Sequence, residues 1–419
     1  MTQLLSKRPD QFSQGVWPGY FSEAQGVEIW DLDGNRYIDM SIGGIGATIL
    51  GYADPDVDTR VHEAIDKGVS SSLNCPEEVE LAQLLCEIHP WAQKVRYARG
   101  GGEAAAMAIR IARSKTGRDK IAFCGYHGWH DWYLSANLNE GNILEGHLLP
   151  GLEPAGVPGA LGGTAFPFHY NRADELRAIV AKHKNELAAI IMEPLRNEYP
   201  KEGFLEEVQS IAQECNAVFI MDEISSGFRL NSGGAHLLFN ITPDIAIFAK
   251  AMGNGYPIAA VIGKARIMEA VEKTFISSTS WTERVGPVAA LATIRKHQQH
   301  NVSGHLMEIG KMVQEGWRNV AKNCGLNISV SGIYPLSHFV FEYEDALVMK
   351  AYFIQELLKK GFLASNIFYA MYAHQREHVE QYLSAVDEVF RDLVELHRKE
   401  CLRESLEGQP AVNGFKRLT

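Results

Sequence analysis

Short apolar runs alternate with amphipathic segments through the middle of the chain. Three of these runs end abruptly at an ionisable residue: 188–192 at Glu193, 217–221 at Asp222 and 245–249 at Lys250. Each run is short, which favours a buried strand over a helix. Helical periodicity is present at 174–183 and 204–215. The alternation of strands with helices predicts an α/β fold built on a mostly parallel sheet.

The two ends of the chain carry a different pattern. Apolar and polar residues alternate over 27–39 around Asp33-Gly34-Asn35, a strong hairpin signal. Beyond the long helical segments 288–300 and 305–323, strands and helices alternate again. We therefore predict an N-terminal arm and part of a small domain at 1–55, a large domain at 56–295, and a C-terminal small domain at 296–419. Residues 141–166 read as a long loop, and 399–419 as a loosely docked tail.

Composition narrows the class of protein. The chain has 419 residues, 46% of them hydrophobic, which is enough for two domains with large cores. Its net charge is −11 and it has no basic block, so we expect no nucleic-acid partner. No apolar run approaches a membrane span, and the N-terminus lacks a signal-peptide core. Six scattered cysteines favour reduced thiols and a cytoplasmic location over disulfides or a zinc site.

Lys250 and Asp222 carry the first chemical hypothesis. A lysine at the end of a buried strand loses water, which disfavours its charged form and makes it a candidate Schiff-base nucleophile. The carboxylate of Asp222, 28 residues earlier, could hold a pyridoxal cofactor's pyridinium nitrogen in its protonated state. Each residue alone has an ordinary alternative: Lys250 as a surface lysine that extends to water, and Asp222 as a helix cap. The two strand ends, 28 residues apart, fit one strand-helix-strand unit of a parallel sheet. The pair in this order favours the chemical interpretation.

A run of three glycines, Gly100-Gly101-Gly102, leads directly into a helical segment that begins at Glu103. Glycines let backbone amides approach an anion closely, and a helix N-terminus adds free N–H groups and a positive dipole end. Gly101, Gly102 and Glu103 are therefore candidate phosphate ligands. A tight strand-to-helix turn is the alternative. The run does not match G-x-G-x-x-G, which argues against a dinucleotide site.

The segment 125–133 concentrates aromatic residues and histidines in a predicted turn. Metal binding by His127, His130 and Asp131 is conceivable there, but no further ligand set supports it, and we expect no metal. Tyr126 offers a flat ring that could stack on a flat cofactor.

Two motifs, Met221-Asp-Glu-Ile-Ser-Ser-Gly-Phe-Arg229 and Ala249-Lys-Ala-Met-Gly-Asn-Gly-Tyr-Pro257, resemble signatures of the class III pyridoxal-phosphate aminotransferases, in particular the glutamate-1-semialdehyde aminomutase-like branch. The similarity runs from about Gly26 to about Leu383. It implies the type I fold of pyridoxal-5'-phosphate-dependent transferases, with a mostly parallel seven-stranded sheet, an antiparallel strand at Ala259–Gly263, and a smaller α+β domain. It also implies Lys250 as the catalytic, cofactor-bearing lysine and Asp222 as the partner of the pyridine nitrogen.

Further site residues follow from the resemblance. Tyr126 stacks on the cofactor ring, His127 completes that motif, and Glu193 belongs to the Glu-Pro strand end. Thr282 lies five residues before Pro287, where the family places a threonine that reaches the partner subunit's phosphate; a helix N-cap is its alternative. The family's usual Ser-Gly-Thr is replaced by Gly100-Gly101-Gly102, so both hydroxyls are missing and we favour the phosphate role for Thr282. A homodimer with shared sites is implied.

Substrate-reading residues are harder to identify. Arg196, beside Asn197, could clamp a substrate carboxylate, or it could form an ordinary surface pair with a glutamate. Trp17, in the N-terminal arm, either packs on the surface or reaches a site in the partner subunit.

We expect an aminotransferase that takes an amino group from an amino acid, with L-glutamate favoured, and passes it to an aldehyde or keto acceptor by a ping-pong Schiff-base mechanism. The departures at the glycine run and at 281–287 favour sugar-modifying relatives, with an acceptor such as 8-oxo-3,8-dideoxy-octulosonate, as in lipopolysaccharide or sugar biosynthesis. The alternatives are a glutamate-1-semialdehyde 2,1-aminomutase, which transfers the group within one substrate, and a non-catalytic relative that uses the fold for binding. Retention of Lys250 and Asp222 argues against the last.

Overall fold

The computed structural model describes residues 3–138, 143–147, 151–195 and 197–412. The described chain divides into two compact units, one within Met1–Pro55 and Asn301–Gly414 and the other within Asp56–His300. The larger unit contains every predicted cofactor-binding residue.

A seven-stranded sheet forms the centre of the larger unit, in the order β4-β10-β9-β8-β7-β5-β6. Only β10 runs antiparallel to its neighbours, so the predicted mostly parallel sheet and its antiparallel strand are both confirmed. The strands span Lys94–Ala98 (β4), Lys120–Cys124 (β5), Ala165–Pro167 (β6), Leu187–Met192 (β7), Val218–Asp222 (β8), Ile245–Phe248 (β9) and Ala259–Gly263 (β10).

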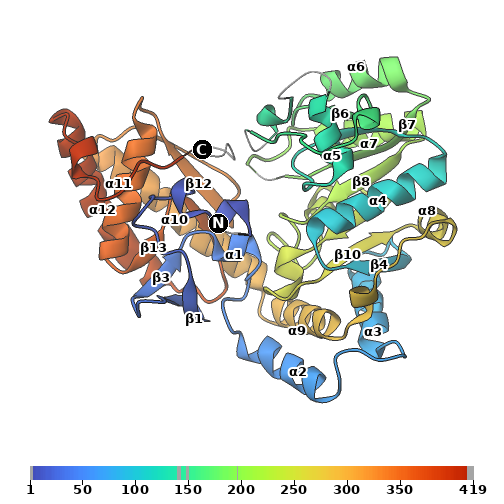
Figure 1. Cartoon of the computed structure of the whole chain (residues 1–419), viewed down its shortest axis with the longest axis horizontal. Coiled ribbons are helices and arrows are strands. Elements are labelled where there is room, and N and C mark those ends of the chain that lie inside the picture. Colours follow the sequence, from blue (N-terminus) through green and yellow to red (C-terminus); the bar gives the residue numbers. More distant parts are fainter. Residues whose placement is uncertain (1–2, 139–142, 148–150, 196, 413–419) are drawn as a thin grey trace. The chain divides into compact units, whose positions relative to one another are not determined.

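Helices cover both faces of this sheet (Figure 1). Successive strand residues point to opposite faces, and Ile190 and Ile191 are both fully buried, which requires cover on each side. The α-helices of this unit are Pro55–Asp66 (α2), Pro76–Ile88 (α3), Gly101–Thr116 (α4), Asp131–Leu134 (α5), Ala173–His183 (α6), Phe204–Cys215 (α7), Ala265–Met268 (α8) and Val285–Gln299 (α9).

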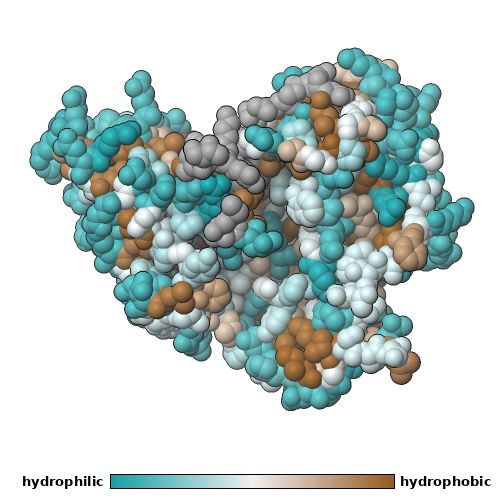
Figure 2. Space-filling view, in the orientation of Figure 1, coloured by the Kyte–Doolittle hydropathy of each residue, from teal (hydrophilic) through white to brown (hydrophobic). Residues whose placement is uncertain are grey.

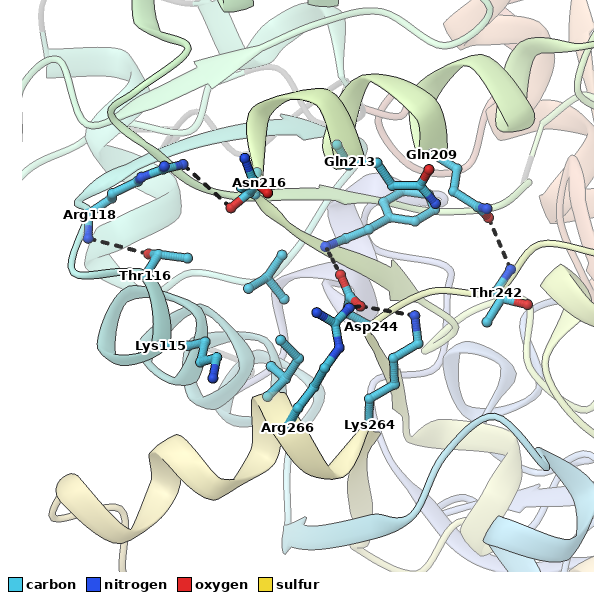
Figure 3. Close-up of a pocket in the computed structure, with 15 residues that line it drawn as sticks. Lys115, Thr116, Arg118, Gln209, Gln213, Asn216, Thr242, Asp244, Lys264 and Arg266 are labelled. Atoms are coloured by element: carbon cyan, nitrogen blue, oxygen red, sulfur yellow. Dashed lines mark hydrogen bonds and ion pairs between the residues drawn. The ribbon is translucent and has the colours of Figure 1, made fainter.

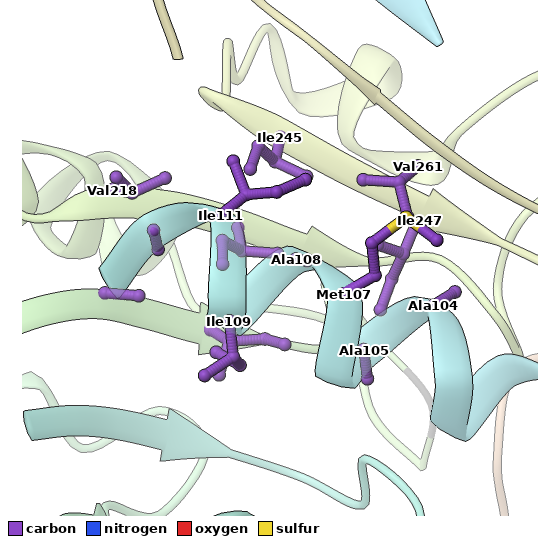
Figure 4. Packing of buried hydrophobic residues seen from close by; sticks show 14 of the residues in the cluster. Ala104, Ala105, Met107, Ala108, Ile109, Ile111, Val218, Ile245, Ile247 and Val261 are labelled. Atoms are coloured by element: carbon purple, nitrogen blue, oxygen red, sulfur yellow. The ribbon is translucent and has the colours of Figure 1, made fainter. Parts of the chain in front are cut away.

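Helix α4 lies along one face of the sheet, and its small side chains explain how closely it approaches. Ala104, Ala105 and Ala108 are fully buried against strand residues that include Ile245 and Ile247 (Figure 4). Alanine has the highest helix propensity, and its single methyl group lets the helix pack close to the sheet. The helix ends at Gly117, whose φ of 67° suits the left-handed C-terminal position. This packing fixes the helix N-terminus relative to the strand ends.

Strands β7, β8 and β9 are parallel neighbours, so Glu193, Asp222 and Lys250 lie at or just beyond the same edge of the sheet. The connection from β8 to β9 differs from the predicted strand-helix-strand unit. Between Asp222 and Ile245 the chain forms a series of turns and one short 3₁₀ helix, η6 (Ala235–Phe239). Gly227, Gly233 and Gly234 in this segment are crowded by neighbouring atoms, so a larger side chain at any of them would force a shift.

The smaller unit combines two sheets with three long helices. One sheet has the order β1-β2-β3-β13 and the other β11-β12-β14. The strands are Phe21–Gln25 (β1), Glu28–Asp31 (β2), Arg36–Met40 (β3), Ile328–Ser331 (β11), Leu336–Phe341 (β12), Phe362–Ala364 (β13) and Ile367–Tyr369 (β14). The helices are Gly43–Gly46 (α1), Val302–Cys324 (α10), Ala346–Lys359 (α11) and Arg376–Arg398 (α12). The predicted hairpin at 27–39 is confirmed as β2–β3, and the α+β character of the unit is confirmed as well.

The predicted loose tail is wrong for the described residues up to 412. Leu402 and Ala411 are buried, and the Gln409 N–H donates to the carbonyl oxygen of Gln14. The polar composition of the segment concealed these contacts, because a few apolar residues suffice to dock it. No helix in the described ranges is long and apolar enough to cross a bilayer.

Candidate active site

Lys250 begins a short 3₁₀ helix, η7 (Lys250–Gly253), directly after β9 and Ala249. Its φ of 47° is left-handed, a strained conformation for a residue other than glycine that is common at functional sites. The side chain is half-buried, and its Nζ donates to Ser225 Oγ at 2.8 Å. The amine is therefore held by a protein hydroxyl, which favours the chemical interpretation over a lysine that extends to water.

Asp222 ends strand β8 and is almost fully buried. Its Oδ2 lies 2.6 Å from His127 Nδ1, and its Oδ1 accepts the N–H of Ile224 at 3.0 Å. A buried carboxylate needs such partners, because desolvation without them is costly. No helix begins at Asp222, so the capping alternative is wrong. The carboxylate is held at the edge of the sheet, one strand away from Glu193.

His127 uses both ring nitrogens within the protein. Nδ1 pairs with Asp222, and Nε2 lies 3.2 Å from the carbonyl oxygen of Cys124, to which it donates. Neither nitrogen is left for a metal, and the described residues include no cluster of three or more metal-ligating side chains. The metal alternative for His127 with His130 and Asp131 thus has no geometric support. The role of His127 in this structure is to orient Asp222.

Glu193 fixes the turn that carries Tyr126. Glu193 follows β7 and is buried, and its Oε2 accepts the Tyr126 N–H at 3.2 Å. Gly125 has a φ of 110°, and a Cβ there would lie 2.5 Å from Glu193 Oε2, so only glycine lets the carboxylate approach this closely. The half-buried ring of Tyr126 packs edge-on to Tyr133, with centroids 5.8 Å apart. Tyr126 is therefore held at the same edge of the sheet as Lys250 and Asp222.

The glycine run forms a cradle, by which we mean residues 100–103. Glu103 Oε2 accepts the N–H groups of Arg99 and Gly100, at 2.9 and 3.0 Å. Gly101 and Gly102 are the first two residues of α4, so their N–H groups have no acceptor within the helix. A Cβ on Gly101 would meet Ile224, and one on Gly102 would meet His130, each at 2.9 Å. Free amides at the N-terminus of a sixteen-residue helix, with no side chain in the way, fit a phosphate group.

Thr282 ends the 3₁₀ helix η9 (Thr279–Thr282) and is exposed, with its hydroxyl donating to the Thr279 carbonyl at 3.4 Å. The helix-cap alternative for this residue is wrong. Glu283 caps α9 instead, since its carboxylate accepts the N–H groups of Val285 and Gly286 at 2.6 and 2.9 Å.

The structure describes two of the three predicted substrate residues, Trp17 and Asn197. Trp17 lies in the smaller unit and stacks on Phe12, with ring centroids 4.1 Å apart. Asn197 is exposed, and Arg196 lies outside the described residues. Their assignment to the substrate stays a prediction.

The sequence interpretation missed three contacts at this edge. Ser225, which lies in the motif 221–229, is the partner of Lys250, and Glu223 bonds to Ser226 and to the buried His236. Desolvation opposes ionisation of Glu223, but these donors outweigh it and the pKa of Glu223 is lowered. A hydroxyl three residues after the strand-end acid Asp222 was the available signal for Ser225. The contact of Glu223 with His236 joins residues 13 apart in sequence, and no periodicity indicates it.

A separate cavity of about 460 Å³ lies at the opposite edge of the sheet, beside the first residues of β8. Lys264 and Arg266 both pair with Asp244 there, and Arg118 bonds the carbonyl oxygens that end α7 (Figure 3). These basic groups satisfy a carboxylate and a helix C-terminus of the protein itself. The carboxyl edge, where ionisable groups converge at the strand ends, is the candidate active site.

The family model "Aminotransferase class-III" matches residues 13–389. Among curated relatives, the chain is 33% identical to 3-aminobutyryl-CoA aminotransferase of Cloacimonas acidaminovorans (strain Evry), over 88% of this chain and 86% of that protein. It is 31% identical to glutamate-1-semialdehyde 2,1-aminomutase of Alkaliphilus oremlandii (strain OhILAs), over 90% and 92%. It is 29% identical to 2'-deamino-2'-hydroxyneamine transaminase of Streptomyces kanamyceticus, over 92% and 93%.

Among solved structures, the FumI protein of Sphingopyxis sp. MTA144 superposes with a TM-score of 0.85 over 98% of this chain and 95% of that one, at 22% identity. This likeness shows that the two proteins share a fold.

Proposed function

The chain belongs to the class-III aminotransferase family, and we propose that it transfers an amino group from L-glutamate to a hydroxylated aldehyde or keto acceptor. Enzymes of this family use pyridoxal 5'-phosphate, and the strand-end residues fit that group: an amine, a buried anion, a flat ring and a free helix N-terminus. The observation that carries the proposal is the arrangement of Lys250 and Asp222 on neighbouring parallel strands, each held by a partner side chain.

The chain's residues divide the chemistry between them. When bound, the cofactor supplies an electron sink for the substrate carbon that loses its proton. Asp222, oriented by His127, would hold the proton of the pyridine nitrogen, and Tyr126 would pack against the ring. The amides of Gly101 and Gly102 would bind the phosphate. Lys250 would hold the cofactor, and its Nζ is the group that would take the proton from the substrate carbon and return it in each half-reaction.

The proposed acceptor rests on two departures from the family pattern. The cradle lacks hydroxyls and the segment 281–287 differs, and both departures favour a sugar-modifying enzyme, for instance an 8-amino-3,8-dideoxy-octulosonate transaminase. The relative named for a hydroxyneamine supports a hydroxylated acceptor. To test this choice, keto-sugars are screened for the ability to return the glutamate-treated enzyme to the absorbance band of bound pyridoxal phosphate.

The second candidate is the intramolecular reaction of glutamate-1-semialdehyde 2,1-aminomutase, which the 31% identity to that enzyme favours. The two reactions differ in what they require. An aminomutase converts a single substrate with no separate donor, whereas the proposed transferase turns over only when donor and acceptor are both present. A non-catalytic binding role would show neither activity, and the pairing of Lys250 with Ser225 and of Asp222 with His127 argues against it.

We propose further that the enzyme is a homodimer with shared sites. Large apolar side chains are exposed on the larger unit, among them Leu73 at 82% and Phe275 at 90%. Figure 2 shows apolar surface over α2, the helix that precedes Val69 and Leu73. A second copy of the chain would cover these residues and bring the exposed Thr282 to the partner's cradle. Sedimentation of the wild type and of Leu73→Asp tests this: the variant should shift towards monomer.

A visible absorbance scan before and after addition of L-glutamate tests the central reaction. The purified protein should show the band of bound pyridoxal phosphate, and glutamate without an acceptor should convert it to the spectrum of the amino form. A band that does not respond to glutamate would contradict glutamate as donor. No band after addition of the cofactor would overturn the proposed function.

A further inference from the structure

Arg99 immediately precedes the cradle and reaches the segment that carries Thr282. Its Nη2 lies 2.9 Å from Glu283 Oε1 and 3.1 Å from the Glu283 carbonyl oxygen, and its Nη1 donates to the Ala98 carbonyl. Both side chains are largely covered, with exposed fractions of 15% for Arg99 and 20% for Glu283. Water therefore screens this ion pair less than it screens an exposed pair. Removing it should destabilise the local structure more than removing an exposed pair would.

Each end of this ion pair is fixed independently. On the cradle side, Glu103 accepts the backbone N–H groups of Arg99 and Gly100. On the other side, the Glu283 carboxylate accepts the first N–H groups of α9. Gly286 is also required there, because a Cβ at that position would lie 2.9 Å from Glu283 Oε1. The Arg99 side chain is thus a cross-link between two helix N-termini.

The next residue along the chain extends the network. Arg284 Nε donates to Glu77 Oε2 on α3 at 3.1 Å, and its backbone N–H donates to the Val69 carbonyl. The segment 282–284 is therefore tied to α3, to the cradle and to α9 on three sides. Thr282 immediately precedes Glu283, whose carboxylate and carbonyl oxygen accept the hydrogen bonds of Arg99.

We propose that Arg99 and Glu283 are positioning residues that set the affinity for the cofactor's phosphate, by holding the cradle amides and Thr282 in fixed places. The proposal rests on the proposed function. In this chain the cradle has no hydroxyl of its own, so phosphate binding depends on where its backbone amides lie and, in the proposed dimer, on where the Thr282 hydroxyl from the second copy lies. Within one copy the ion pair joins the cradle to the segment that carries Thr282 and holds both in place, and this rigidity compensates for the missing side-chain ligands.

The test compares pyridoxal 5'-phosphate with pyridoxal, which lacks the phosphate. Dissociation constants for both are measured by absorbance titration of the full-length apoprotein. Arg99→Met and Glu283→Gln should each weaken binding of the phosphorylated compound about tenfold or more and leave pyridoxal within about twofold. The double variant should resemble the single ones, because the two changes remove the same interaction. Arg99→Lys, which keeps the charge, should recover part of the loss.

Arg295→Met is the matched control. Arg295 lies on α9 and pairs with Glu80 of α3, and both side chains are exposed. It should leave both dissociation constants unchanged. Equal losses for the two compounds in Arg99→Met and Glu283→Gln, or no loss for either, would overturn the inference while the proposed function stands. A variant with altered far-UV circular dichroism is set aside, and the other single variant decides. A wild-type protein that binds neither compound would instead overturn the proposed function itself.

Discussion

His127 Nδ1 lies 2.6 Å from Asp222 Oδ2, and both side chains are buried. Because Nε2 donates to the Cys124 carbonyl, the ring orientation is fixed and the second nitrogen can serve only the carboxylate. Asp222, at the end of β8, is therefore held in one position by a histidine that follows β5, the strand on the far side of β7. In the proposed reaction, this pair keeps the anion where the pyridine nitrogen needs it.

Replacing His127 with Asn should lower kcat about 5- to 100-fold. The physical reason is that leaving one oxygen of a buried carboxylate without its hydrogen-bond partner costs about 1–3 kcal/mol. Steady-state kinetics, together with a pH titration of the cofactor's absorbance, checks this, since the histidine acts through Asp222. Asp222→Asn, which removes the charge, should be worse than His127→Asn. A His127→Asn enzyme with wild-type kcat would contradict the positioning role.

Adding a side chain to the cradle should weaken cofactor binding at one glycine and leave it unchanged at another. At Gly102 a Cβ would lie 2.9 Å from His130 Nδ1, whereas at Gly100 the nearest atom is Glu103 Oε2 at 3.9 Å. Gly102→Ala should weaken pyridoxal-phosphate binding about tenfold or more. Gly100→Ser should retain it and stabilise α4 by a few tenths of a kcal/mol, because serine is a favoured N-cap. Equilibrium titration and thermal melts of the two variants distinguish these outcomes; equal losses would contradict the cradle.

Ser225→Ala should lower kcat modestly, about 3- to 10-fold. The variant removes one hydrogen bond to Lys250 Nζ, worth about 0.5–1.5 kcal/mol. Ser225→Thr should restore most of the rate, because it keeps the hydroxyl. Comparing kcat with KM checks the assignment: a loss confined to KM would indicate that Ser225 contacts the substrate rather than the lysine.

Asp39, in the smaller unit, should make stability depend on pH. Burial raises the pKa of Asp39 to about 6, and the hydrogen bonds from Tyr52 and Ser41 only partly oppose this. The folded pKa lies above the unfolded value of about 3.9, so the contribution to stability is fully present below about pH 4 and is lost as the pH rises through 6. A shift of about two units corresponds to about 3 kcal/mol.

Asp39→Asn should remove this dependence. Urea unfolding of both proteins at pH 4.5 and pH 7.5 isolates the effect, because all other groups cancel in the difference. The stability of the variant relative to the wild type should rise between these pH values. A difference that stays constant with pH would show that Asp39 does not titrate in this range.

The strand ends were predictable because a buried strand has a simple signature. The runs that end at Glu193, Asp222 and Lys250 contain almost nothing but apolar residues, and parallel neighbours bring their ends to one edge. The glycine run predicted a helix N-terminus because a helical pattern follows it directly. Local sequence therefore indicates both the strand ends and this helix N-terminus.

The partners of these residues were not predictable from local sequence. His127 meets Asp222 across 95 residues, and Arg99 meets Glu283 across 184. Such contacts depend on the order of strands in the sheet, which periodicity does not give. The turns between β8 and β9 escaped prediction because tertiary packing around Gly227, Gly233 and Gly234 determines them. The docking of residues 402–411 depends on only a few buried side chains.

The most direct test of the account is to locate the residue that binds the cofactor covalently. Borohydride reduction of the loaded enzyme, followed by digestion and mass spectrometry, fixes the cofactor on the lysine that holds it. We predict that the peptide containing Lys250 carries the added mass, and that Lys250→Ala carries none and has no transferase activity. A label on any other lysine, or an active Lys250→Ala enzyme, would contradict the assignment of this site.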